Sequence, residues 1–216
     1  MRNKDIAKLN ESLKKIPIKH LRIGIVNLGW PCPGLNNVIY GLLRFADQYG
    51  FAEIIGFVGG IDGLIAGSHI TITHSNFELY KNQGGGDFLG CSTRYLPFEG
   101  EGHLEEFEKV AKVCKSLHLD GLVINGATHN LSSATYFSEY LLQKGIDVWV
   151  IGIPTTVDSN MKHKFIEATV GFDSASKVFS QLTGNIFTDA ASSIKYWYLI
   201  RIMGKDPSHL VLETAL

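Results

Sequence analysis

Residues 151–173 read IGIPTTVDSNMKHKFIEATVGFD, and the interpretation of the whole chain starts from this stretch. The apolar run at 148–151 predicts a buried strand, and the breakers in residues 152–154 (GIP) predict a turn directly after it. Such a turn would place Thr156 and Asp158 beyond the carboxyl end of the strand, where open α/β sheets bind ligands. Asp158 is therefore a candidate base for a substrate hydroxyl. An aspartate after a proline turn also often caps a turn or a helix, and that alternative stays open.

The composition is that of a globular protein. Of the 216 residues, 45% are hydrophobic, and the formal net charge is −1, which argues against a general nucleic-acid-binding protein. No apolar run reaches the roughly 18 residues that span a bilayer, and residues 1–20 lack the apolar core of a secretory signal. Cys32, Cys91 and Cys114 are widely spaced and form no zinc motif. We therefore expect a protein of the reducing cytoplasm, with neither nucleic acid nor a membrane as partner.

Strand-like and helix-like patterns alternate along the chain. Residues 21–28 (LRIGIVNL) predict a strand, residues 29–34 (GWPCPG) a turn, and residues 35–49 a helix with apolar side chains at three- and four-residue steps. Further strands are expected at 53–58, 69–73, 122–124 and 196–203, and further helices at 1–16, 101–117, 131–142, 174–186 and from 207 onward. This alternation predicts an α/β fold: a mostly parallel sheet with helices on both faces, in a Rossmann-like three-layer sandwich.

The sequence contains no interdomain linker, internal repeat or low-complexity tract. Residues 1–20 are interpreted as an N-terminal helical extension, and residues 21–216 as one domain. The last residues, LVLETAL at 210–216, continue an apolar pattern without a helix-ending signal. The domain is therefore expected to be a fragment of a longer chain.

Several motifs occur in an order that resembles the phosphofructokinase family. GIPTTVDSN at 152–160 is followed by VGFDSA at 170–175 and IRIMGK at 200–205. GWPCPGLNNVIYG at 29–41 and YKNQGGGDFLG at 80–90 lie where that family has its two glycine-rich loops. The resemblance spans the whole predicted domain. It is strongest to the long pyrophosphate-dependent branch, which includes plant-type α and β subunits, the α subunit being chiefly regulatory.

The resemblance implies a fold of the phosphofructokinase N-terminal type. It also implies a complete enzyme that transfers a phosphoryl group from ATP or pyrophosphate, with Mg²⁺, to fructose 6-phosphate in glycolysis. By this resemblance Asp158 is the catalytic base, with Thr156 beside it. Both also belong to the sugar-phosphate site, together with Met203, Gly204 and Lys205. The lysine keeps the charge of the arginine that the family has there but loses its bidentate geometry.

The donor side departs from the family pattern. The donor-phosphate loops correspond to Gly29 and Trp30 in the first turn and to Gly126, Ala127 and Thr128 in the second. Ala127 stands where the family has an aspartate that helps to hold Mg²⁺, and a methyl group offers that ion no oxygen ligand. Trp30 replaces a glycine, and its indole would fill space meant for the donor. We therefore expect no metal-binding residue and a donor site that does not work, since the loss of even one electrostatic stabiliser slows catalysis by ~10²–10³.

Other positions in the motifs bear on the same question. Asn160 and Thr155 replace an acidic residue and a lysine of the family, and His129 and His163 are more simply read as loop histidines than as metal ligands. A working enzyme would need another acidic group for Mg²⁺, and the candidates are Asp62 and Asp87.

Three functional hypotheses follow. The preferred one is a regulatory, α-like phosphofructokinase domain that is inactive by itself, binds fructose phosphates and assembles with phosphofructokinase-type subunits as a homo- or hetero-oligomer. The first alternative is an active ATP- or pyrophosphate-dependent phosphofructokinase. The second is an unrelated nucleotide-binding Rossmann-type module. The last is disfavoured because no acidic ribose-binding residue follows a GxGxxG turn.

Overall fold

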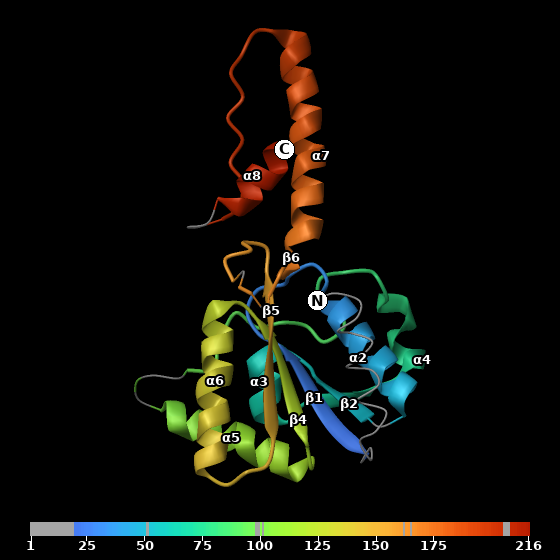
Figure 1. The fold of residues 1–216 in the computed structure, drawn as a ribbon, viewed down its shortest axis with the longest axis vertical. Coiled ribbons are helices and arrows are strands. Elements are labelled where there is room, and N and C mark those ends of the chain that lie inside the picture. Colours follow the sequence, from blue (N-terminus) through green and yellow to red (C-terminus); the bar gives the residue numbers. More distant parts are fainter. Residues whose placement is uncertain are drawn as a thin grey trace.

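The computed structural model describes residues 20–216, except for 51, 98–99, 101, 162, 165 and 205–207. In that part of the chain a six-stranded sheet has the strand order β3-β2-β1-β4-β5-β6 (Figure 1). Every adjacent pair is parallel except β2 and β3, which confirms the mostly parallel α/β fold. The strands are β1 (Leu21–Asn27), β2 (Ala52–Phe57), β3 (His69–Ile72), β4 (Gly121–Gly126), β5 (Trp149–Thr156) and β6 (Val170–Gly171).

Helices cover both faces of the sheet because the central strands are apolar on both sides (Figure 1). Neighbouring residues of β1 point to opposite faces, so Val26 packs with α3, α5 and α6, whereas Ile25 packs with α2 and α4. The predicted helix at 1–16 lies outside the described residues. The described helices are α2 (Leu35–Tyr49), α3 (Gly60–Ala66), α4 (His74–Phe77), α5 (His103–Ser116), α6 (Thr128–Gln143), α7 (Phe172–Ser193) and α8 (His209–Ala215), with a 3₁₀ turn, η1, at Glu78–Tyr80.

The final 45 or so residues form an arm that projects beyond the sheet (Figure 1). It consists of α7, a segment at 195–204 that is neither helix nor strand, and α8, which packs back against α7. Phe172, Ala175 and Leu210 form a small core of their own, against which Val157 and Ile202 also pack. The arm is therefore joined to the carboxyl edge of the sheet through the loop that follows β5.

The strand β5 is longer than predicted, and the expectation that Gly152 and Pro154 end it is wrong. The strand continues to Thr156 because its pairing partner changes along its length. Pairing with β4 ends at Pro154, and pairing with β6 begins at Thr155. A proline has no N–H to donate and is tolerated where a ladder changes partner.

The prediction of a strand at 196–203 is also wrong. The chain has neither helix nor strand there, and no strand of the described residues pairs with it. Two helices are longer than predicted: α7 extends to Ser193, and α6 already begins at Thr128. None of the described helices is both long enough and apolar enough to cross a membrane.

Candidate functional site

Two buried asparagines lie at the carboxyl ends of the central strands. Asn27 of β1 and Asn125 of β4 are neighbours in the sheet and are 0% exposed. The Asn125 side chain donates from Nδ2 to Oδ1 of Asn27 at 2.8 Å, and Nδ2 of Asn27 donates to the Gly90 carbonyl at 3.4 Å. This edge of the sheet is thereby tied to the second glycine-rich loop. Neither side chain was predicted to belong to the site, although each is a polar residue at the end of an apolar run.

Asn130, in the first turn of α6, holds the two predicted donor loops together. Its Nδ2 donates to the Leu28 carbonyl at 3.2 Å. A Cβ atom added at Gly29 would lie 2.8 Å from that Nδ2, and one added at Gly126 would lie 2.4 Å from Cβ of Asn130. Only glycine fits at these two positions. Both loops therefore contact one side chain, which the sequence analysis did not single out.

The remaining donor-loop residues lie at the surface. Trp30 is 78% exposed, so its indole lies in solvent rather than inside the first turn. Ala127 and Thr128 are exposed at the start of α6, where Ala127 provides no side-chain cap. Buried polar groups normally have a hydrogen-bond partner, yet Oδ1 of Asn125 and Oδ1 of Asn130 have none among the described residues. These are acceptors that suit a donor such as a hydroxyl rather than a phosphate oxygen.

The residues at this edge do not fit Mg²⁺. Asp62 accepts a hydrogen bond from Nη1 of Arg94 at 2.6 Å, and Arg94 also pairs with Glu106. Asp87 accepts one from Nδ2 of the buried Asn36 at 2.9 Å. Nowhere in the described ranges do three His, Cys, Asp or Glu side chains gather closely enough to hold a metal ion. The two carboxylates considered as replacements for the missing aspartate are thus engaged elsewhere.

The Thr156–Asp158 turn is held by local hydrogen bonds. The Asp158 N–H donates to Oγ1 of Thr156 at 3.1 Å, and Oγ1 of Thr169 donates to the Thr156 carbonyl at 2.7 Å. Ser159 is buried with a φ of +53°, a conformation that costs free energy in a non-glycine residue and needs support from its surroundings. The half-buried Asp158 carboxylate forms no ion pair with the described residues. A fixed backbone therefore presents a free acceptor.

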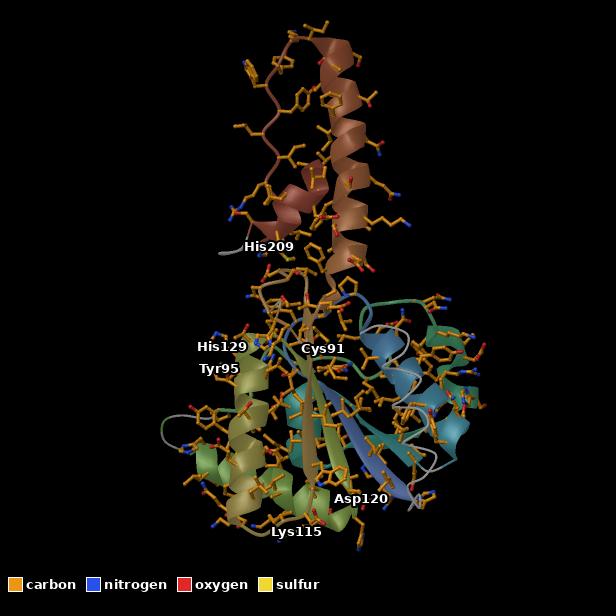
Figure 2. The ribbon with its side chains drawn as sticks, viewed as in Figure 1. Cys91, Tyr95, Lys115, Asp120, His129 and His209 are labelled. Carbon is orange, nitrogen blue, oxygen red and sulfur yellow. The ribbon has the colours of Figure 1, made fainter. Side chains whose placement is uncertain are left out.

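Cys32 joins the first glycine-rich turn to strand β6. Its thiol donates to the Val170 carbonyl at 3.3 Å, and a Cβ atom at Gly171 would lie 2.3 Å from its Sγ. Burial, followed by the charges of Cys91 and Asp158, raises the pKa of Cys32 to about 11. Asp158 is thus close enough to act electrostatically on the first turn. Figure 2 shows Cys91 and His129 near this edge, whereas Lys115 and Asp120 lie at the opposite one.

The raised thiol pKa predicts a slow reaction of Cys32 with iodoacetamide. At neutral pH a shift from 9.0 to about 11 lowers the reactive thiolate fraction about a hundredfold. The rate should rise as the pH approaches 11, because the folded-state pKa is raised and the proton leaves late. Alkylation at Cys32, followed by mass spectrometry of peptides, measures it, with the urea-unfolded chain as control. Equal rates in the folded and unfolded chains at pH 8 would contradict the prediction.

The segment at 203–205, predicted to bind the sugar phosphate, follows the part of the arm that contains Ile202. Ile202 packs against the small core that also contacts Val157, so Met203 and Asp158 each follow a residue of the same cluster. Met203 is exposed, Gly204 has a φ of +145°, and Lys205 lies outside the described residues. The other candidate positions differ in burial: Asn160, His129 and His163 are exposed, and Thr155 is buried in β5.

Comparison with known proteins identifies the fold and the family. The family model described as phosphofructokinase matches residues 22–216. The chain belongs to the phosphofructokinase family. The phosphofructokinase relatives include the pyrophosphate–fructose 6-phosphate 1-phosphotransferase of Treponema pallidum, 38% identical over 91% of this chain and 34% of that protein. Two plant relatives, from Arabidopsis thaliana, are subunit alpha 2 (38% identical, 93% of this chain and 31% of the subunit) and subunit beta 2 (35%, 96% and 36%) of the same activity.

Solved phosphofructokinase structures share this fold. The pyrophosphate-dependent phosphofructokinase of Marinobacter aquaeolei superposes with a TM-score of 0.75 at 19% identity, covering 90% of this chain and 48% of that one. The phosphofructokinase of Saccharomyces cerevisiae gives 0.75 and 19%, covering 89% and 27%. This phosphofructokinase-family chain spans about a third of the length of the curated relatives that it matches.

Proposed function

We propose that this chain is a regulatory, fructose-phosphate-binding domain of the pyrophosphate-dependent phosphofructokinase group and that it transfers no phosphoryl group by itself. The observation that carries the proposal is a contrast along one edge of the sheet. The turn bearing Thr156 and Asp158 is ordered by hydrogen bonds and presents the Asp158 carboxylate, which forms no ion pair with the described residues. The donor loops beside it have Ala127 at the position of the family's metal-binding acid, and the candidate replacements Asp62 and Asp87 accept hydrogen bonds from other side chains.

The acceptor side has the groups that a sugar phosphate needs. The Asp158 carboxylate can accept a hydrogen bond from a sugar hydroxyl, and Thr156 keeps the backbone of that turn in place. We assign the sugar phosphate to Met203, Gly204 and Lys205, since a glycine lets the backbone approach the phosphate and a lysine supplies positive charge. The small core shared by Val157 and Ile202 supports this assignment, because it brings the two segments to one place.

The donor side lacks the charge that polyphosphate transfer requires. Such transfer depends mainly on positioning the donor and the acceptor and on stabilising the negative charge of the phosphoryl group in the transition state. The free buried side-chain oxygens near the donor loops, on Asn125 and Asn130, are uncharged acceptors and cannot replace a carboxylate in that role. Neither ATP nor pyrophosphate is therefore a substrate of the isolated chain in this proposal.

The proposed setting is a glycolytic assembly in the cytoplasm. The relatives named as alpha and beta subunits support a homo- or hetero-oligomer with phosphofructokinase-type subunits, in which active copies carry out the reaction. In such an assembly a domain that binds fructose phosphates without consuming them would report their concentration to its neighbours.

Two measurements on the purified chain test the proposal. Isothermal titration calorimetry with fructose 6-phosphate and fructose 1,6-bisphosphate should show binding, with glucose as a control that lacks phosphate. A coupled assay with Mg²⁺ and either pyrophosphate or ATP should show no turnover above the buffer blank. Turnover by the chain alone would favour the active enzyme instead. Binding of a dinucleotide but of neither sugar phosphate would favour the Rossmann-type module.

Asp158→Asn distinguishes a binding role from a catalytic one. The amide still accepts a hydrogen bond and removes a negative charge that repels the phosphate dianion. We therefore expect the affinity for fructose 6-phosphate to stay within about threefold of wild type. Calorimetry on the variant and on wild type measures this. If the wild-type chain turns over substrate and the variant loses that activity, the regulatory assignment is wrong and Asp158 is the base.

A further inference from the structure

Thr169 is a buried threonine whose hydroxyl reaches back across the loop that carries Asp158. The residue is 4% exposed, and its Oγ1 donates to the Thr156 carbonyl at 2.7 Å. The two threonines are 13 positions apart in the sequence. This hydrogen bond therefore closes the loop at its base, directly beside the turn at 156–158.

The carbonyl that Thr169 holds sets the direction in which the chain leaves β5. A peptide unit is planar, so a hydrogen bond that fixes the Thr156 carbonyl also fixes the N–H of Val157. Oγ1 of the same Thr156 accepts the Asp158 N–H at 3.1 Å. Two hydrogen bonds in series thus connect Thr169 to Asp158 through Thr156.

Asp158 depends on this support because its side chain has no charged anchor in the described part of the chain. The half-buried carboxylate forms no ion pair there. The next residue, Ser159, is buried with a φ of +53°, which the surrounding structure must stabilise. The direction of the carboxylate therefore follows from the backbone of the turn.

Thr169 is itself placed by the strand that follows it. The two residues of β6 pair in parallel with the last two residues of β5 (Figure 1). The Val170 carbonyl also accepts the Cys32 thiol of the first glycine-rich turn at 3.3 Å. The Thr169 hydroxyl is thus attached to a segment that is held on two sides.

We propose that Thr169 is a positioning residue, which holds the Asp158 carboxylate in the orientation that accepts a sugar hydroxyl. Because Thr169 is buried, it acts through Thr156 and not by contact with a ligand. The inference rests on the proposed function for the ligand, but the effect of Thr169 on the turn can be measured without any ligand.

Thr169→Val and Thr169→Ser separate positioning from packing. Valine has the shape of threonine but no hydroxyl, whereas serine keeps the hydroxyl and loses a methyl group. In the valine variant the Thr156 carbonyl loses this donor, so the Asp158 N–H should exchange with solvent at least about fivefold faster. In the serine variant the rate should stay within about twofold of wild type. Hydrogen exchange followed by NMR measures both, with Ile124 in the centre of the sheet as an internal reference.

Thr214→Val is the matched control. Thr214 is also buried, and its Oγ1 donates to a backbone carbonyl, that of Leu210, at 2.6 Å, but within α8. This variant should leave exchange at Asp158 unchanged. Circular dichroism checks that the variants are folded. If Thr169→Val does not fold, Thr169→Cys replaces it, because a thiol is a weaker donor and should still accelerate exchange.

Calorimetry measures the consequence for binding. The affinity for fructose 6-phosphate should fall about threefold to tenfold in Thr169→Val and stay near wild type in Thr169→Ser. Unchanged exchange in the valine variant, equal acceleration in the serine or Thr214 variant, or unchanged affinity despite faster exchange would each overturn the proposal. A wild-type chain that binds no sugar phosphate would overturn the proposed function instead, whereas faster exchange confined to the valine variant would still support the positioning of Asp158 by Thr169.

Discussion

Replacing Gly63 by alanine is expected to destabilise the fold by at least about 3 kcal/mol, despite the higher helix propensity of alanine. A Cβ atom at this position in α3 would lie 1.7 Å from the Val58 carbonyl oxygen, which is backbone and cannot move aside by a rotamer change. Relieving the clash would shift α3, whose Ile61 and Leu64 are fully buried in the core. Urea unfolding monitored by circular dichroism measures the loss.

Gly41→Ala is the matched control for this prediction. Gly41 also lies within a helix, α2, but a Cβ atom there would meet nothing within 4 Å. Its replacement should therefore stabilise the protein by about 0.5–1 kcal/mol through helix propensity and a less flexible unfolded chain. If the two variants had similar stabilities, the close approach of α3 to Val58 would be wrong.

Gly171→Ala is expected to have the second-largest effect, and it should act on the site. Gly171 has a φ of +103°, which an L-residue rarely adopts, and its Cβ atom would lie 2.3 Å from Sγ of Cys32. The first turn and the start of α7 must then separate. We expect the affinity for fructose 6-phosphate to fall at least about tenfold, since misplaced binding groups lose much of their interaction energy. Calorimetry measures the affinity.

A second readout separates this prediction from the proposed function. Moving the turn should expose the Cys32 thiol, so its alkylation should be faster in Gly171→Ala than in wild type, whether or not a sugar phosphate binds. Gly184→Ala lies in the same helix with no neighbour within 4 Å of its Cβ atom, and should change neither quantity. Adding Cys32→Ala removes the clash with sulfur but not the backbone strain, so it should recover only part of the affinity. Unchanged alkylation in Gly171→Ala would contradict the described packing.

Much of the fold could be predicted because local patterns and global packing agree. The helix predicted at 35–49 has the bounds of α2, since its apolar residues repeat with the helical period and glycines lie at both ends. The predicted end of β5 at residues 152–154 was wrong because β5 exchanges one pairing partner, β4, for another, β6, just after Pro154. Glycine and proline did not end the strand there. The unpaired state of 195–203 could not be predicted, since composition indicates the tendency to form a strand but not the presence of a neighbour.

Only part of the arrangement at this edge of the sheet could be predicted from the sequence. Motif order singled out Thr156, Asp158 and the glycines of both donor loops, and their roles stay predictions. The buried side chains that connect the loops were not identified. Asn27 and Asn125 are 98 residues apart and Leu28 and Asn130 are 102 apart, so these contacts form only once the sheet is assembled. The Trp30 indole was expected inside the donor space but lies in solvent. The expectation was wrong because no sequence rule gives the direction of a side chain on a turn.

The position of β1 also constrains how a new chain folds during synthesis. This strand is made first among the described ones, yet it lies in the middle of the sheet, and one of its edges pairs with β4 about a hundred residues later. Until residue 126 has left the ribosome, β1 has one unpaired edge and exposed apolar side chains, because β2 can cover only its other edge. Pairing over such a distance is slow, so the nascent protein should depend on chaperones during this interval. Ribosome-bound chains stopped before and after β4 should therefore differ sharply in protease resistance.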